Sequence, residues 1–340
     1  MVAILATAQL IINFATWNLR GIGSPDTPNI SREVEYNRIL RREQLAMDCC
    51  RYGLDIVGLQ ETKSRNYENL VYPNNYRVII FDQIGECHGG VGFVVSPRIS
   101  ECIDVIVRVS NRICYIDLSV SLKGGGVKKF RVVNCYGYTP GRAAKPHEAK
   151  NVAKHWEALY SVCEVPSKWE LFVVGDFNAK IGKRTHDDES HGLSNQIGSH
   201  GIGRRNANGE VLLQFMCKFD LTACNTLFCH PSRRKLTWTG QKTVSGQKTP
   251  LYAQLDYVLC KHRSVTSLQN SRAHGGATLV SDHKPVVAKV ALAHHYLLFK
   301  KKTPAIKRYN CSTLHADIGT RIAYQIERSA YSCYQQRVPQ

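Results

Sequence analysis

Residues 171–178 of this 340-residue chain read LFVVGDFN, and this stretch decides how the rest of the sequence is interpreted. The apolar run 171–174 predicts a buried strand, and Gly175 would allow the backbone to turn sharply at its end. Asp176 and Asn178 then lie two residues apart at the edge of a sheet, where a carboxylate and an amide can share one water molecule. Hydrolysis needs a base for such a water and a donor that holds it. The stretch therefore predicts a strand that is followed by residues of the types that hydrolysis needs.

Similar polar endings recur along the chain. Polar side chains at the ends of successive strands of a packed sheet are delivered to one cleft. The stretches are IINFATWN (11–18), DIVGLQE (55–61), RVVNCY (131–136), QLDYVLC (254–260) and SDHKP (281–285), the last followed by an apolar strand over 286–292.

The order of the remaining elements indicates an α/β fold. Helices are predicted over 31–51, where Ser31 is a suitable N-cap, over 147–163, and over 208–219 with Asn206 or Asn208 as the cap. Further strands are expected in four segments, followed by a turn at 124–126 that leads to a strand over 128–136. These segments are 76–81, 90–95, 102–109 and 113–121. Many strands with a few inserted helices predict two packed mixed β-sheets flanked by helices.

The composition favours a nucleic-acid partner. The chain carries 45 Lys and Arg against 27 Asp and Glu, a formal net charge of +18, and a basic surface of this size attracts polyanions. Its 13 cysteines are scattered without any C-x-x-C pair, so neither a disulfide framework nor a zinc site is expected and a reducing intracellular compartment fits better. No apolar run is long enough to span a membrane, and no stable membrane association is expected.

The six segments together resemble the endonuclease/exonuclease/phosphatase superfamily. TWN (16–18), LQE (59–61), NCY (134–136), GDFN (175–178), QLDYVL (254–259) and SDHKP (281–285) occur in the family's order and cover about residues 12–292. The segments 200–210 and 233–239 further resemble the endonuclease domain of RTE-type non-LTR retrotransposons and the host proteins called craniofacial development protein 2-like. The resemblance implies a four-layered α/β sandwich and metal-dependent phosphodiester hydrolysis.

The resemblance also implies a role for each catalytic candidate. Asp176 would be the base that activates water, and Asn178 would orient that water. His283 would donate to a phosphate oxygen, with Asp256 fixing the tautomer of its ring. Tyr136 would bond a phosphate oxygen through its phenol.

The alignment of Tyr136 with the family's pattern leaves an alternative open. Tyr138 precedes Thr-Pro, which also fits the family's pattern, so Tyr136 is favoured without excluding Tyr138.

The expected cofactor is Mg²⁺, with Mn²⁺ as an alternative. Glu61 would be the main ligand, because hard divalent cations prefer oxygen donors and keep several of their waters. Asn18 would support the metal and the phosphate, and Asp282 would contact the metal through water. Many members of the family carry an acid two residues after the asparagine, where this chain has Arg20, and a second metal position is therefore left open.

The expected partner is duplex DNA, contacted through its backbone, which positions an enzyme without reading sequence. Basic residues in predicted loops or at strand starts are the candidate phosphate contacts, and no obligate protein partner can be inferred. They are Arg112, Arg142, Arg204 and Arg205, with Arg233 and Arg234 as further members of the set.

We expect one domain over residues 1–292 and a basic tail over residues 293–340, which holds eight Lys or Arg against two acids and resembles a retrotransposon linker. The predicted function is a DNA-nicking endonuclease of retrotransposon origin that is intracellular and nuclear. Three other substrate readings keep the fold: an abasic-site nuclease, an RNA nuclease and a phosphoinositide phosphatase. The last usually carries a W-C-D-R signature that QLDYVLC lacks. A catalytically inactive nucleic-acid-binding protein is the alternative from a different class.

Overall fold

The computed structural model describes residues 10–22, 32–83, 89–122, 126–141, 145–244, 246–292 and 296–297. The chain separates into two units, residues 1–299 and 300–340. The second unit holds most of the predicted basic tail and lies outside the described residues. Ser31, Arg142 and the predicted turn residues Gly124 and Gly125 also lie outside them, so these assignments stay predictions.

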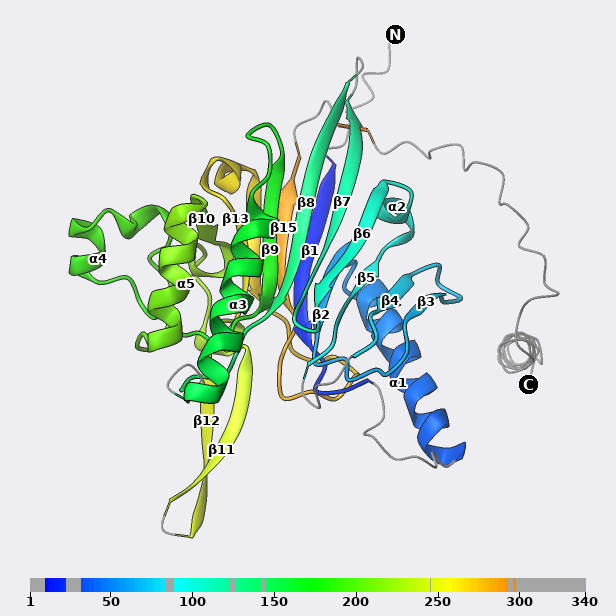
Figure 1. Cartoon of the computed structure of the whole chain (residues 1–340), viewed down its shortest axis with the longest axis horizontal. Coiled ribbons are helices and arrows are strands. Elements are labelled where there is room, and N and C mark those ends of the chain that lie inside the picture. The colour runs from blue at the N-terminus through cyan, green and yellow to red at the C-terminus, as the bar shows by residue number, and fades with distance from the viewer. Residues whose placement is uncertain are drawn as a thin grey trace, which may run out of the picture. The chain divides into compact units, whose positions relative to one another are not determined.

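One seven-stranded sheet, here called sheet A, has the strand order β14-β15-β1-β2-β5-β4-β3 (Figure 1). Strands β1 and β2 run parallel, and the other neighbours are antiparallel. The strands are β1 (Ile11–Asn18), β2 (Ile56–Gln60), β3 (Glu68–Val71), β4 (Arg77–Ile80), β5 (Val91–Val95), β14 (Leu268–Ala273) and β15 (Val286–Ala291).

The second sheet, sheet B, has the order β10-β13-β9-β8-β7-β16, and β6 also pairs with β7. Strands β8 and β9 are parallel. The strands are β6 (Ile103–Ser110), β7 (Ile113–Leu122), β8 (Val127–Tyr136), β9 (Glu170–Asp176), β10 (Leu221–Ala223), β13 (Asp256–Lys261) and β16 (Tyr296–Leu297). Because β16 pairs with β7, sheet B continues beyond residue 292, where the sequence predicted the domain to end.

The two sheets pack face to face through a buried apolar layer. Phe14 of sheet A and Phe172 of sheet B stack with ring centroids 3.9 Å apart and planes 8° from parallel. Successive residues of a strand point to opposite faces, so Leu171 and Val173 leave this layer and join the cluster on the outer face of sheet B. This alternation explains why the central strands are apolar at every position, because both of their faces are covered.

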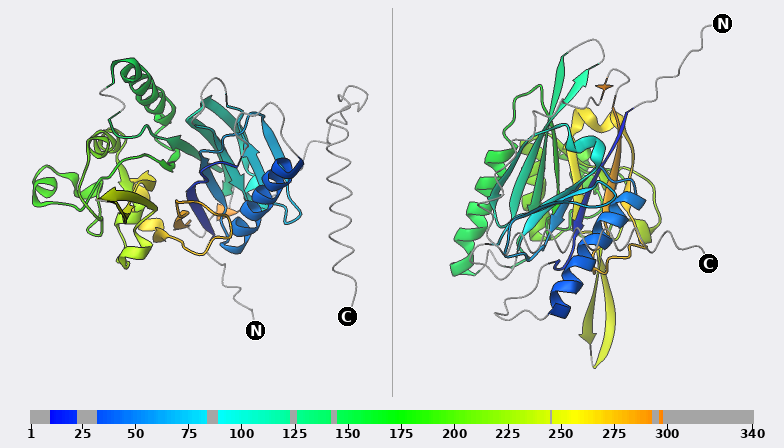
Figure 2. Two further views of the ribbon diagram at one scale, coloured as in Figure 1. Left: turned by 90° about the horizontal axis from the view of Figure 1, so that it is seen from below. Right: turned by 90° about the vertical axis from the view of Figure 1, so that its right-hand side faces the viewer.

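Helices cover the outer faces of both sheets, as Figure 2 shows. Leu45 and Cys49 of α1 (Arg32–Arg51) pack on sheet A. Leu159 of α3 (Pro146–Cys163) and Phe215 of α5 (Ala207–Lys218) pack on sheet B. The result is the predicted four-layered sandwich, and Asn206 caps α5 by accepting a hydrogen bond from the Gly209 nitrogen. Two shorter helices are α2 (Pro97–Ser100) and α4 (His186–Ser190).

Strands β11 (Trp238–Val244) and β12 (Gln247–Ala253) form a separate antiparallel hairpin. In Figure 1 this hairpin extends away from the two sheets. The sequence did not predict it, because its residues are mostly exposed and lack an apolar period.

No helix among the described residues is both long and apolar enough to cross a membrane.

Gly175 has a different role from the one predicted. It lies inside β9 rather than at a turn, and a Cβ atom on it would approach the Cys135 carbonyl oxygen to 2.0 Å. Glycine is therefore required because β8 and β9 approach closely there. The sharp change of direction falls at Asn178, whose φ of 49° lies in the left-handed region.

Candidate active site

Strand register brings the polar ends of sheet B together. The parallel pairing of β8 with β9 sets Tyr136 beside Asp176, and the antiparallel pairing of β9 with β13 sets Asp176 beside Asp256. In sheet A, Asn18 at the end of β1 lies beside Gln60 at the end of β2, so Glu61 follows directly.

The side chain of Asn18 connects the two sheets at this edge. It is fully buried, and its Nδ2 atom donates to Glu61 Oε1 at 3.0 Å and to Asp176 Oδ2 at 2.8 Å. Its Oδ1 atom accepts from the Arg20 backbone nitrogen at 2.9 Å. One amide therefore sets the spacing of two carboxylates that come from different sheets.

Glu61 is held as an anion by three side chains. Its Oε1 atom also accepts from the Tyr136 hydroxyl at 2.8 Å, and its Oε2 atom lies 2.9 Å from Lys63 Nζ. Burial alone would raise the pKa of Glu61, but the hydrogen bonds from Asn18, Lys63 and Tyr136 and the charge of Lys63 lower it to about 2. The φ of 50° at Glu61 turns the chain out of β2 at this point.

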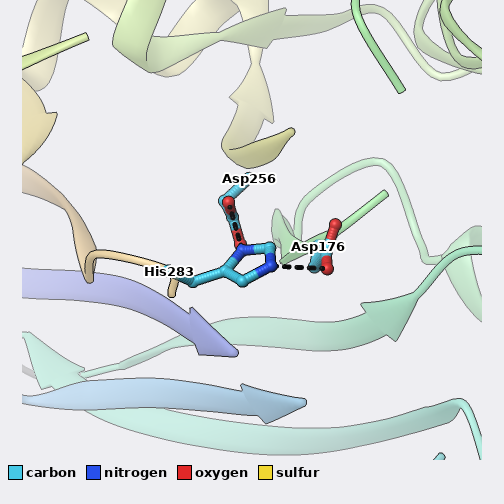
Figure 3. A group of neighbouring side chains, drawn as sticks. All are labelled: Asp176, Asp256 and His283. Carbon is cyan, nitrogen blue, oxygen red and sulfur yellow. Dashed lines mark hydrogen bonds and ion pairs between the residues drawn. The ribbon is translucent and has the colours of Figure 1, made fainter. Parts of the chain in front are cut away.

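His283 lies between two buried carboxylates, as Figure 3 shows. Its Nδ1 atom is 3.0 Å from Asp256 Oδ2, and its Nε2 atom is 3.8 Å from Asp176 Oδ2. The distance of 3.8 Å between Nε2 and Asp176 Oδ2 is within ion-pair range but too long for a hydrogen bond. The Nε2 atom is therefore left with a proton to offer to a third group.

The charges around His283 favour its protonated form. Burial alone would lower its pKa, but the neighbouring Asp256 and Asp176 raise it to about 10. Burial and the charge of Asp256 in turn raise the pKa of Asp176 above its ordinary value. A carboxylate with a raised pKa is a stronger base than an exposed one.

Neighbouring backbone and hydroxyl groups fix this histidine and its partner. The Ser281 hydroxyl accepts from the His283 nitrogen at 3.1 Å and donates to the Asn18 carbonyl at 2.7 Å. The Thr237 hydroxyl accepts from the Asp256 nitrogen at 3.2 Å, and Asn225 donates to the Asp256 carbonyl at 3.0 Å. Thr237 and Asn225 were not predicted, because their partner Asp256 lies 19 and 31 residues away in sequence.

Asn178 lies beside Asp176, with its side chain half-buried. Its backbone nitrogen donates to Asp176 Oδ1 at 2.9 Å, while its side-chain Nδ2 donates to the Gly137 carbonyl at 3.1 Å. The residue thus holds the carboxylate through its backbone and joins two strand ends through its amide.

Asp282 is at the rim of the site and pairs with the unusual Arg20. Its Oδ2 atom lies 3.4 Å from the Arg20 guanidinium and accepts from Trp238 Nε1 at 3.3 Å. Its Oδ1 atom is buried and has no hydrogen-bond partner among the described residues. Arg20 is therefore an ion-pair partner of Asp282, at the position where many family members carry an acid.

The two tyrosines have different surroundings. Tyr136 contacts Glu61, whereas Tyr138 packs edge-on against His155 with ring centroids 5.4 Å apart. The guanidinium of Arg112 lies 4.6 Å from the ring centroid of Tyr136 and 4.1 Å from that of Tyr138. The geometry therefore brings Tyr136, and not Tyr138, to Glu61.

Two of the predicted DNA contacts make contacts within the protein, and their role toward DNA stays a prediction. Arg112 is only 5% exposed, and it also donates to the Gly137 carbonyl at 3.3 Å, so it orders the tyrosines from inside the protein. Arg205 is paired internally with Asp188 at 2.7 Å. Arg204 is exposed and stays a candidate contact.

Several residues of the site were given no role from the sequence. Lys63 pairs with Glu61, and behind it Gln60 donates to Asn134 Oδ1 at 2.6 Å and accepts from the Thr16 hydroxyl at 3.1 Å. Thr16, Gln60 and Asn134, which these hydrogen bonds connect, are all fully buried. A polar side chain inside an apolar strand was the signal that could have identified Gln60 and Asn134, because buried amides need partners.

Two places in the site could hold a metal ion. Asp176, Asp256 and His283 offer ligand atoms within 4.8 Å of one another. The ring of His283 is already paired with both carboxylates, which favours an ionic triad there. Glu61 offers an ionised carboxylate that already faces a cation, the Lys63 ammonium, and this fits a hard divalent ion.

Comparisons with known proteins identify the family of the chain. A model described as "Endonuclease/Exonuclease/phosphatase family" matches residues 15–283. The chain is 29% identical over 278 residues to craniofacial development protein 2 of Bos taurus, covering 82% of this chain and 40% of that protein. It is also 29% identical to the protein of the same name in Tragulus javanicus, with 42% of that protein covered. The chain thus spans about two fifths of these curated relatives.

Solved structures show the same fold at low sequence identity. A 3′ phosphatase, NExo, from Neisseria bound to a product DNA hairpin aligns with a TM-score of 0.55 and 18% identity, over 83% of this chain and all of that chain. An AP endonuclease from Archaeoglobus fulgidus aligns with a TM-score of 0.52 and 17% identity, again over 83% of this chain and all of that chain. These similarities establish the fold.

Proposed function

The chain belongs to the endonuclease/exonuclease/phosphatase family, and from its site we propose that it is a Mg²⁺-dependent phosphodiesterase that nicks duplex DNA. The observation that carries this proposal is the shared amide of Asn18, which donates to Glu61 at 3.0 Å and to Asp176 at 2.8 Å. It holds the candidate metal ligand and the candidate base at a fixed spacing, as an in-line displacement at phosphorus requires.

Asp176 would take the proton of the attacking water. Its raised pKa makes it basic enough for this role, and the Asn18 amide and the Asn178 nitrogen fix the carboxylate by one hydrogen bond to each oxygen. A buried and oriented carboxylate avoids the cost of reorganising water around a base at the moment of reaction.

His283 would donate from Nε2 to a non-bridging phosphate oxygen. Its Nδ1 atom is on Asp256, which fixes the ring and stabilises the imidazolium. A protonated donor placed where negative charge grows on the phosphate lowers the barrier. Tyr136, which donates to Glu61 in this structure, would supply a second donor to the phosphate.

Glu61 would hold the divalent cation, with Asn18 beside it and Asp282 contributing through water. A bound Mg²⁺ or Mn²⁺ would neutralise charge on the phosphate and on the leaving oxygen. Arg20 adds a positive charge beside Asp282, so we infer that Glu61 is the principal protein ligand of a single ion.

DNA is the substrate that the charge and surface features favour. The formal net charge is +18, and the exposed hairpin β11–β12 carries Lys242 and Lys248. A two-stranded ribbon of this kind fits the major groove of B-DNA. The Neisseria relative of the same fold is described as bound to a DNA hairpin. Retrotransposon ancestry and a nuclear location are part of this proposal.

A plasmid assay tests the proposal directly. Supercoiled plasmid is incubated with the protein in Mg²⁺ or in EDTA, beside the Glu61→Gln variant, and parallel reactions contain an abasic duplex, single-stranded RNA and a phosphoinositide. We expect relaxed circles only with the wild type and Mg²⁺. Turnover of RNA or of the lipid, with intact plasmid, would assign another substrate, and absence of all turnover would indicate an inactive binding protein.

A further inference from the structure

A pocket lined by cations lies beside the candidate active site. Its volume is about 290 Å³. The side chains that line it come from three separate segments: Arg233 and Arg234 before β11, Arg272 and His274 at the end of β14, and Lys284 directly after His283. None of the described residues that line it is acidic. We call this set the basic pocket.

The charges of the basic pocket are not balanced within the described part of the protein. No carboxylate of the described residues lies within ion-pair distance of Arg233, Arg234, Arg272 or Lys284, in contrast to Arg205, which pairs with Asp188. Burial, followed by the charges of Arg272, Arg234 and His230, lowers the pKa of His274 to about 4. A positive potential of this kind favours an anionic ligand.

The walls of the pocket are held by hydrogen bonds that do not use its guanidinium groups. Lys284 Nζ donates to the Arg233 carbonyl at 3.2 Å, and the Lys284 nitrogen donates to the Thr237 carbonyl at 2.8 Å. The His274 nitrogen donates to the Pro285 carbonyl at 2.8 Å. The segments before β11, after β14 and before β15 are thus joined around the pocket, which gives it a defined shape without any ligand.

The backbone links the basic pocket to the catalytic histidine. His283 directs its ring toward Asp256 and Asp176, whereas the next residue, Lys284, lines the pocket. Trp238 forms an isolated bridge with His283, only four residues after Arg234. Lys284, which lines the pocket, directly follows the candidate phosphate donor His283. A group bound in the pocket would therefore lie next to the candidate active site.

We propose that the basic pocket binds a phosphate oxyanion, and that this phosphate belongs to the DNA strand, next to the one that is cleaved. The proposal rests on the proposed function for the identity of the strand, while free phosphate is the other source of the same chemistry. Arginine guanidinium groups bind phosphate oxygens in pairs, and the pocket is at the small end of the range for ligand sites. Such a contact positions the strand without reading its sequence.

The first measurement uses inorganic phosphate as the probe. Its binding is followed by titration calorimetry and by the shift in melting temperature, for the wild type and for the double variant Arg234→Gln/Arg272→Gln. Arg234 is exposed and Arg272 is half-buried. Removal of the two charges relieves like-charge repulsion between them, so the variant should melt no lower than the wild type without phosphate. We expect phosphate to raise the wild-type melting temperature and to leave that of the variant unchanged.

The second measurement uses a duplex oligonucleotide in EDTA, so that binding is separated from cleavage. Removal of one phosphate contact should reduce the slope of log Kd against log salt by about 0.9. The control is Lys150→Gln/Lys154→Gln, which removes the same charge from the exposed face of α3. A smaller slope in the pocket variant but not in this control would assign the pocket to the DNA strand.

The outcomes separate the pocket from the proposed function. If the variant no longer binds phosphate but keeps the wild-type DNA slope, the pocket takes free phosphate and its assignment to the strand is overturned. If the wild type binds no phosphate and the salt slopes of the wild type and the pocket variant are equal, the basic pocket is not a phosphate site. This holds even if Mg²⁺-dependent nicking is observed. If the protein binds phosphate but no DNA, the proposed function is contradicted, while the phosphate-binding role of the pocket is retained.

Discussion

Asn18, the last residue of β1, donates a hydrogen bond of 2.8 Å to Asp176, the last residue of β9. The two strands belong to different sheets, so this bond joins the sandwich at the edge where the candidate site lies. Both side chains are buried, at 0% and 1% exposure, and a hydrogen bond to a buried charge is among the stronger contacts in a protein. The spacing of the two carboxylates bonded to Asn18 therefore depends on how the sheets pack.

Asn18→Ala should reduce nicking by about 100-fold, because displacement of a reacting group by about 1 Å has an effect of that size. The measurement is the single-turnover rate at saturating Mg²⁺ and DNA. Asn13→Ala, at the start of the same strand, is the matched control and should retain the wild-type rate. Equal rates for Asn18→Ala and the control would remove the amide from the mechanism.

Tyr136→Phe should slow nicking by roughly 10- to 100-fold, because it removes a hydrogen bond to the charged Glu61. Tyr138→Phe retains the ring that packs on Arg112 and should stay near the wild-type rate. The comparison decides which of the two tyrosines has the role that the sequence left open. A larger decrease in Tyr138→Phe would reverse the assignment.

The apolar strands and the polar residues at their ends were predictable from the sequence. The strand over 171–174 and its neighbours are apolar because both faces are covered, and the motif order indicated the fold. The edge strand β3 and the hairpin β11–β12 were missed, since exposed strands need no apolar pattern. The position of Arg112 beside two tyrosine rings could not be predicted from its charge, because it is a tertiary contact.

Gly175→Ala should destabilise the fold, because its new Cβ would overlap the Cys135 carbonyl of the neighbouring strand. Overpacking of this kind costs about 1–3 kcal/mol. Gly275→Ala has no heavy atom within 4 Å of the new Cβ and serves as the control. The urea midpoints of both variants test this, and equal midpoints would contradict the close approach of β8 and β9.

His155 should make the protein sensitive to mild acid. Burial, and then the charge of Arg112, lowers its pKa from 6.5 to about 3, so the unfolded chain takes up a proton that the folded chain does not. This makes the free energy of unfolding fall as the pH drops from 6.5 towards 3, by at most about 1.4 kcal/mol per pH unit. His155→Gln should show a shallower fall.

Urea midpoints at pH 7, 6 and 5 measure that difference. His147→Gln is the control, because the side chain of His147 is 75% exposed and the variant should follow the wild-type curve. If His155→Gln and the wild type lose stability in parallel over this window, His155 is not held neutral in the fold.

The water-activating role of Asp176 is the centre of this account, and the single-turnover nicking rate of Asp176→Asn tests it most directly. The substitution keeps the size of the side chain and removes the base, so we expect the rate in Mg²⁺ to fall by roughly 10²–10⁴-fold with DNA binding retained. Circular dichroism and DNA affinity in EDTA verify that the variant is folded and competent to bind. A variant that binds DNA and nicks at the wild-type rate would show that Asp176 is not the base.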